Sequence, residues 1–261
     1  MMNTSIKRVS RDCVEDIINR GIIIHQFKTN VKGKKFIKSG RKNDGEEGHW
    51  LEQLMGIIRN NNNAPDKLGY EQKKQSKKTT FGDWSASNYL YKNIDITRDE
   101  FIKTVGSPNP KKNNRYSWSG KVFPTYGQNY NYAGQRIIFL DNGDLVIQYL
   151  HSKDTREEKT SFIEEFKSND QITLAIWKKQ KLEKCVNDKF NVKGFYICKK
   201  NKDDIYEKIC FGKTIDFIFL KNGLEQGNIF LDSGMYQGNA RQYSSFRANE
   251  NVWNKLITEE Y

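Results

Sequence analysis

The sequence contains no apolar run of the roughly 20 residues that a membrane-spanning helix needs. Its opening stretch, MMNTSIKRVSRDC, also lacks the apolar core of a secretory signal peptide. The four cysteines show no Cys-x-x-Cys spacing, so a zinc site is not expected, and reduced thiols are the simplest interpretation. We therefore expect a cytoplasmic protein that has no membrane partner.

Histidine is scarce, with only His25, His49 and His151 in the chain. None of the three has a second histidine or a cysteine at helical spacing, as a zinc site would need. Each is therefore expected to be structural or exposed, and a histidine-based metal site is not predicted.

Acidic residues are outnumbered by basic ones. The chain has 44 lysines and arginines against 32 aspartates and glutamates, which gives a formal net charge of +12 and a pI of about 9.3. Such an excess points to a polyanionic partner, most often nucleic acid. A lysine-rich proteome is the alternative explanation. With 261 residues, 36% of them hydrophobic, the chain is long enough for one large domain or two lobes with a real core.

The first predicted helix lies in SRDCVEDIINRGII. Ser10 is a candidate N-cap, and Gly21 is expected to end the helix. The apolar stripe predicted for it consists of Cys13, Ile17 and Ile18. A second helix is predicted in EEGHWLEQLMGIIRN, where apolar residues recur at helical spacing.

Further along, helical and extended segments alternate. ITRDEFIKTVG predicts a short helix capped by Thr97, with Glu100 at the third helical position. Asn142 and Gly143 lie between two apolar runs and predict a hairpin. The segments VKGFYICKK, YEKICFG and TIDFIFLK are typical of strands. One α/β fold with two lobes is the simplest account.

Two acids and a lysine stand close together in the polar stretch from Asn60 to Thr80. Asp66, Glu71 and Lys73, which we call the acid block, follow the pattern D-x4-E-x-K. Glu71 and Lys73 share one face if they lie on a strand, and a preceding turn can bring Asp66 alongside Glu71. Two carboxylates are suitable ligands for Mg²⁺ beside a phosphate, and Lys73 can orient or deprotonate the attacking water. The alternative is a solvated hairpin with alternating charges.

The acid block resembles the motif of a known nuclease family when the preceding helix is included. Leu51–Leu54 places Glu52 in a Leu-Glu-x-Leu context, and Pro65–Asp66 and Glu71–Lys73 follow in the same order. In these features the chain resembles the MvaI/BcnI-type restriction endonucleases, in the MutH-like branch of the PD-(D/E)xK nucleases. The resemblance implies a type II restriction endonuclease that hydrolyses double-stranded DNA with Mg²⁺, for which Mn²⁺ can substitute. It makes Asp66 and Glu71 metal ligands, Lys73 the residue that assists the water, and Glu52 a second-sphere or occasional ligand.

The same resemblance implies an architecture. It predicts an α/β PD-(D/E)xK core, with a central mixed sheet flanked by helices and two lobes that form a DNA-binding cleft. Residues 1–105 are expected to form the catalytic lobe. Residues 106–261 are expected to form mainly the recognition lobe, with segments that can return to the core sheet. A monomer is expected, together with a DNA methyltransferase of the same system that is not a binding partner. The alternatives are a MutH-like strand-nicking repair endonuclease and a catalytically inert DNA-binding protein.

The chain departs from that family in two places. Gln72 lies between the motif Glu and Lys, where the family usually has an apolar residue, so a solvated or edge strand is expected there. Some relatives place histidines in the C-terminal recognition segment. This chain has none after His151, so its base contacts and target sequence are expected to differ.

Two segments combine the residue types that read DNA. Arginine can pair with guanine, and asparagine or glutamine with adenine. The segment MYQGNARQYSSFRAN supplies Tyr236, Asn239, Arg241, Tyr243 and Arg247. The earlier segment SPNPKKNNRYSW supplies Lys111, Arg115 and Tyr116, and its lysines are expected to touch phosphates. On residue types alone, a surface loop with packed aromatic residues is equally open, and the family resemblance favours DNA contact.

Overall fold

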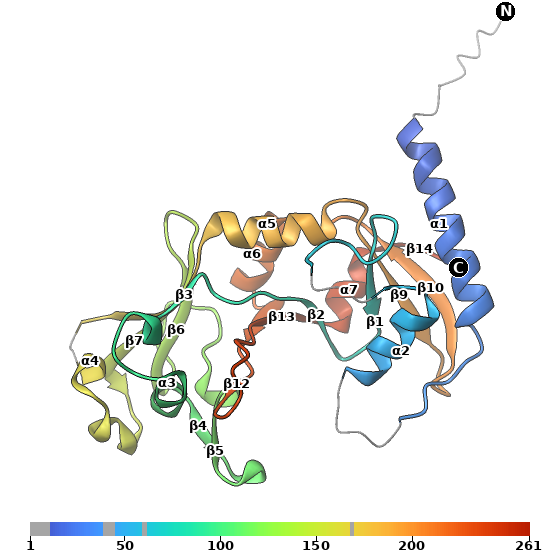
Figure 1. Cartoon of the computed structure of the whole chain (residues 1–261). Helices are drawn as coiled ribbons and strands as arrows, with labels where there is room; N and C mark the ends of the chain where they lie inside the picture. Colours follow the sequence, from blue (N-terminus) through green and yellow to red (C-terminus); the bar gives the residue numbers. More distant parts are fainter. Residues whose placement is uncertain (1–10, 39–44, 59–61, 168–169) are drawn as a thin grey trace, which may run out of the picture. The chain divides into compact units, whose positions relative to one another are not determined.

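The computed structural model of the chain describes residues 11–38, 45–58, 62–167 and 170–261 (Figure 1). The chain forms two compact units. Unit 1 takes its described residues from 1–75, 192–214 and 256–261, and unit 2 consists of those in 76–191 and 215–255. The chain thus leaves unit 1 after Gln75 rather than near residue 105. The predicted division into a catalytic and a recognition lobe stays a prediction.

Unit 1 contains a four-stranded mixed sheet. The strands lie in the order β1-β9-β10-β14, with β1 parallel to β9 and the other pairs antiparallel. Their bounds are β1 Glu71–Lys74, β9 Phe195–Lys200, β10 Tyr206–Gly212 and β14 Ile257–Glu260. Two helices, α1 (Arg11–Asn30) and α2 (Glu46–Leu54), belong to the same unit.

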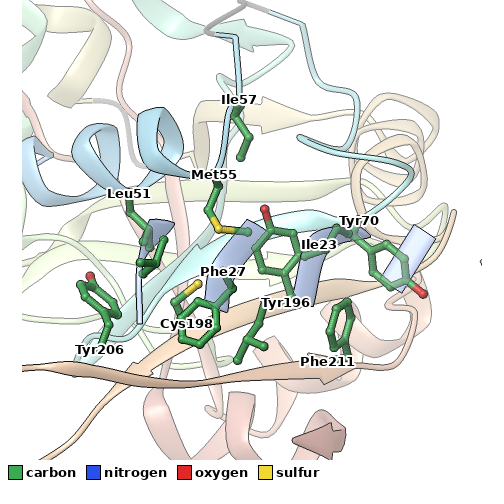
Figure 2. Close-up of a cluster of buried hydrophobic side chains, with 12 residues drawn as sticks. Ile23, Phe27, Leu51, Met55, Ile57, Tyr70, Tyr196, Cys198, Tyr206 and Phe211 are labelled. Carbon is green, nitrogen blue, oxygen red and sulfur yellow. The ribbon is translucent and has the colours of Figure 1, made fainter. Parts of the chain in front are cut away.

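The core of unit 1 joins both helices to the sheet (Figure 2). Its aromatic and aliphatic side chains are buried, and fully burying one such side chain stabilises the fold by about 1.5–3 kcal/mol. The cluster includes Ile23 and Phe27 from α1, Leu51 from α2, Tyr196 and Cys198 from β9, and Phe211 from β10. Because Tyr196 and Cys198 are two residues apart on one strand, α1 and α2 pack on the same face of the sheet.

The prediction for α1 is wrong in its end point and in its buried face. The helix continues past Gly21 to Asn30, and its buried residues are Ile23 and Phe27. The predicted stripe is exposed, with Ile17 at 64% and Ile18 at 57%. A helical glycine costs only about 1 kcal/mol, less than the burial of two large side chains in the following turns provides. Ser10 lies outside the described residues.

Unit 2 contains three sheets. The first has the order β11-β13-β2, the second β12-β5-β4 and the third β3-β8-β7-β6. Their bounds are β2 Lys78–Asp83, β3 Asn88–Tyr89, β4 Ser107–Asn109, β5 Arg115–Trp118, β6 Ala133–Phe139, β7 Leu145–Asp154, β8 Ile172–Trp177, β11 Ile229–Asp232, β12 Met235–Tyr236 and β13 Ser245–Asn249. The α-helices are α3 Arg98–Val105, α4 Glu164–Lys167, α5 Lys179–Phe190, α6 Phe217–Glu225 and α7 Glu250–Leu256, where the last residue belongs to unit 1.

In unit 2, the predicted hairpin turn and the predicted helix cap are both confirmed. Gly143 has a φ of +83° in the turn that joins β6 to β7 as an antiparallel hairpin. Thr97 and Glu100 form a capping box at the start of α3. The prediction of a strand in TIDFIFLK is wrong, because this segment contains the start of α6, with Asp216 as its N-cap. Periodicity alone does not distinguish a short buried helix from a buried strand.

No helix in the described part of the chain is long and apolar enough to cross a membrane.

Candidate active site

A tight turn lies inside the acid block. The N–H of Lys67 donates to the carbonyl of Tyr70 at 3.0 Å, and the N–H of Tyr70 donates to the carbonyl of Lys67 at 2.9 Å. The two central residues have positive φ, +51° at Leu68 and +86° at Gly69. This is the backbone of a type I′ hairpin turn, which reverses the chain within two residues. The structure thus contains the turn predicted between the two acids.

The turn sets the register of the two acids. With Lys67 paired to Tyr70, the next positions outward are Asp66 and Glu71, which therefore stand across from each other. Asp66 Oδ2 accepts a hydrogen bond from the backbone N–H of Gln72 at 2.9 Å. The carboxyl group of Asp66 is therefore held at the start of β1.

Leu68 is an unusual residue for this turn, because a leucine in the left-handed region costs about 1–2 kcal/mol. Leu68→Asn is expected to raise the midpoint of thermal unfolding by roughly 2–4 °C, since asparagine tolerates positive φ. The side chain of Leu68 is 41% exposed, so little buried area is lost. Thermal melts followed by circular dichroism measure the shift. Leu68→Ala is the control, because it keeps the Cβ; an equal rise in that variant would show that backbone strain is not the cause.

Glu71 and Lys73 lie on the same face of β1, as predicted. Lys73 Nζ is 2.8 Å from Glu71 Oε1, and the two side chains are only 11% and 4% exposed, respectively. A buried carboxylate needs a partner of this kind, because desolvation of an unpaired charge is very costly. For Glu71 and Lys73, this geometry excludes the alternative of a solvated hairpin.

Gln72 lies on an edge strand, which is one of the two predicted alternatives, since the strand neighbour of β1 among the described residues is β9. Gln72 is only 8% exposed, so the other alternative, a solvated strand, does not apply. The hydroxyl of Tyr196 donates to Gln72 Oε1 at 2.8 Å, and this buried contact supplies the polar partner that the amide requires.

Glu52 lies on α2, where its side chain is 30% exposed and its Oε2 is 3.2 Å from Nδ1 of His49. The pKa of Tyr196 responds both to Glu52 and to the two acids of the acid block. Burial raises the pKa of Tyr196 well above its ordinary value, and the charges of Cys198, Asp66, Glu71 and Glu52 raise it further. The three predicted acids therefore lie within electrostatic reach of one buried hydroxyl.

The donor set of the acid block fits Mg²⁺ better than zinc. In the described part of the chain, no group of three or more histidine, cysteine, aspartate or glutamate residues is arranged to hold a metal. Mg²⁺ does not need such a cage, because it keeps several waters and uses one or two carboxylates together with substrate phosphates. Asp66 and Glu71 satisfy that requirement.

Sequence reasoning missed two residues that fix α2 against the rest of this region. Lys67 Nζ donates to the carbonyl of Met55 at 2.7 Å, just beyond the end of α2, where a cation is favourable. Burial lowers the pKa of Lys67. Glu47 on α2 pairs with Lys74 of β1 at 3.0 Å and with Lys200 of β9. Burial acts to raise the pKa of Glu47, but these two lysines lower it overall.

In unit 2, the structure brings the two predicted DNA-reading segments together. β5, which starts at Arg115, pairs with β12, which ends at Tyr236. The guanidinium of Arg115 lies 3.6 Å from the ring centroid of Tyr236, and that ring is stacked on Tyr243 at 6.5 Å. Arg241 covers Tyr243 at 4.7 Å. Arg115, Tyr236, Tyr243 and Arg241 form what we call the Arg-Tyr stack.

Side chains of α3 hold the loop that carries this stack, and sequence reasoning did not identify them. Arg98 donates to the carbonyl of Arg241 at 2.9 Å, and Asp99 accepts from the N–H of Gly238 at 3.0 Å. Asn239 donates to the hydroxyl of Tyr236 at 2.6 Å. Irregular backbone in this loop is therefore fixed by side-chain contacts.

The remaining predicted DNA-binding residues lie in different settings. Tyr116 follows Arg115 on β5, and its backbone pairs with Gln237. Lys111 is exposed in the 3₁₀ turn Pro110–Lys112. Arg247 lies on β13, in another sheet, 3.8 Å from Asp232. The structure does not join Arg247 to the Arg-Tyr stack.

Arg115 differs from the other arginines of this region. Arg241 pairs with Asp83 at 3.2 Å, and Arg98 lies 3.5 Å from Asp99. Within the described residues, the side chain of Arg115 has no carboxylate partner, and its buried Nε has no hydrogen-bond partner, a feature that it shares with Arg98 and Arg247. The stacked guanidinium of Arg115 is therefore suited to bind an anion or a base edge.

The chain is similar to known restriction endonucleases in sequence and in fold. The family model described as LlaMI restriction endonuclease matches residues 29–261. The type II restriction enzyme ScrFI of Lactococcus lactis subsp. cremoris is 39% identical over 266 residues, covering 92% of this chain and 98% of that protein. The solved complex of restriction endonuclease MvaI with cognate DNA matches with a TM-score of 0.61 and 16% identity, covering 97% of this chain and 98% of that one. The structural match confirms the predicted mixed α/β fold of the PD-(D/E)xK type.

Proposed function

Because this chain belongs to the LlaMI restriction endonuclease family and is a type II enzyme that cuts double-stranded DNA at specific sites, we propose that the acid block is its cleavage centre. The observation that carries the proposal is the buried pair of Glu71 and Lys73, 2.8 Å apart, across the hairpin turn from Asp66. Divalent metal ions are the general cofactor of such enzymes, and in this chain the carboxylate pair favours Mg²⁺, with Mn²⁺ as a substitute.

The residues of the acid block take different roles. Asp66 and Glu71 would hold the metal, which would stabilise the charge that develops on the phosphate and make water a better nucleophile. As an ammonium, Lys73 orients the attacking water and screens the phosphate charge; to help deprotonate the water it must first give up its own proton. Its contact with Glu71 keeps the ammonium group at that position. Glu52 acts from outside the first coordination sphere or as an occasional ligand, and His49 orients its carboxylate.

We assign recognition to unit 2. The Arg-Tyr stack presents Arg115 for base contacts, and Arg241 is a second contact that must first leave Asp83. Tyr116 lies on β5, and Asn239 lies in the loop after β12. Lys111 is assigned a phosphate contact because its side chain is exposed beside β5. Arg247 is retained as a separate DNA contact from β13. A monomeric, cytoplasmic enzyme, accompanied by a methyltransferase that does not bind it, completes the proposal.

Incubation of plasmid DNA with Mg²⁺, with Mn²⁺ and with EDTA tests the cofactor. We expect defined linear fragments with either metal and uncut DNA in EDTA, because the carboxylates alone provide no Lewis acid. Gel electrophoresis and sequencing of the ends give the products and the cut positions. Defined fragments in EDTA would contradict the metal assignment, relaxed circles alone would indicate nicking, and retarded but intact DNA would indicate an inert binding protein.

A further inference from the structure

Gln72 connects the acid block to the strand beside it. Its backbone N–H donates to Asp66 at 2.9 Å, and its side-chain oxygen accepts from Tyr196 at 2.8 Å. Gln72 and Tyr196 are direct partners in the register of β1 and β9. A single residue thus joins the carboxylate of Asp66 to a hydroxyl of the neighbouring strand.

β1 needs such a connection because of its position in the sheet. It has only four residues and lies at the edge, with β9 as its strand neighbour among the described residues. Edge strands are held by fewer hydrogen bonds than central strands and slip or fray more readily. Tyr196 is fully buried in the core of unit 1, packed among side chains from both helices and the sheet, so its hydroxyl is held in place by the core (Figure 2).

We propose that Tyr196 is a positioning residue for the metal-binding acids: its hydroxyl fixes Gln72, and the backbone of Gln72 fixes Asp66. This inference rests on the proposed function of the acid block. Tyr196 takes no part in the chemistry and does not touch the metal or the DNA. Its effect is on how tightly the metal is bound rather than on the rate once the metal is in place.

Tyr196→Phe removes the hydroxyl and leaves the ring. We expect the Mn²⁺ concentration for half-maximal cleavage to rise about fivefold, the change that follows from loss of one buried hydrogen bond. The rate at saturating Mn²⁺ should stay close to that of the wild type. Mn²⁺ binding in the absence of cleavage, measured by electron paramagnetic resonance of the free ion, should weaken by the same factor.

Gln72→Leu/Tyr196→Phe tests whether the two residues act as a unit. Each single variant, Gln72→Leu or Tyr196→Phe, already removes their one hydrogen bond, so the double variant should bind Mn²⁺ about as well as Tyr196→Phe alone. A loss in the double variant equal to the sum of the two single losses would show that the pair does not act as a unit.

Tyr149→Phe is the matched control in unit 2. Tyr149 is also buried, and its hydroxyl contacts Asp154 and His151. Its replacement should lower thermal stability without changing the Mn²⁺ dependence. If Tyr196→Phe behaves in the same way, its role is structural only and the inference is wrong. Asp66→Asn, assayed alongside, separates the two claims: unchanged cleavage in that variant would overturn the proposed function itself.

Discussion

Asp66→Ala is expected to abolish cleavage and to preserve DNA binding. Metal coordination contributes several kcal/mol to such reactions, and about 4 kcal/mol corresponds to roughly a thousandfold in rate. The side chain of Asp66 accepts a hydrogen bond at the start of β1 and is not part of the buried ion pair. Its loss should therefore remove the proposed metal ligand and one hydrogen bond of β1, and leave the buried Glu71–Lys73 pair intact. Single-turnover cleavage measured over a range of Mg²⁺ concentrations, together with a mobility-shift assay in EDTA, gives both quantities.

Lys73→Met is a less direct test of the same centre. Removing this lysine takes away the cation that faces the buried Glu71, so this variant is expected to lose both stability and cleavage.

The control for Asp66→Ala is Glu207→Ala, which replaces an exposed acid on β10 of the same unit. Glu207→Ala should cut at the wild-type rate. Normal cleavage by Asp66→Ala at the same Mg²⁺ concentration would place the metal elsewhere.

The acid block could be predicted because its geometry is local. Asp66, Glu71 and Lys73 lie within eight residues, and a two-residue turn and the alternation of a strand are enough to bring them together. Tyr196 could not be found in this way, because its partner Gln72 is 124 positions away and the register of β1 on β9 is a property of the whole sheet. A single glutamine between two charged residues indicated an edge strand but not its buried partner.

The wrong prediction for α1 also arises because the result depends on contacts between distant parts of the chain. The helix α1 has apolar residues on two faces, and periodicity does not show which face meets the core. Ile17 and Ile18 were predicted to be buried, whereas Ile23 and Phe27 are the residues that pack. The Arg-Tyr stack is a second example. Composition identifies both of its segments, but the contact between them depends on the pairing of β5 with β12, which composition does not predict.

Arg115→Ala is expected to weaken binding to the target site by about 10- to 100-fold, because a bidentate arginine contact to a base is worth about 1–3 kcal/mol. Arg115→Lys should restore little of this, since lysine lacks the planar fork and stacks poorly on Tyr236. Fluorescence anisotropy in EDTA, with a duplex that contains the mapped site and a scrambled duplex, measures affinity and the specificity ratio at fixed salt.

The matched control is Arg136→Ala. Arg136 also covers a tyrosine, Tyr130, at 4.8 Å, but its guanidinium is occupied by Gln148 and Gln171. It should therefore have little effect on DNA affinity. If Arg115→Ala weakens binding to both duplexes equally and reduces the salt dependence by about one ion, Arg115 contacts a phosphate and not a base. Unchanged affinity for both duplexes would remove Arg115 from the interface, because a side chain that is free to pair with DNA cannot be lost from the complex without cost.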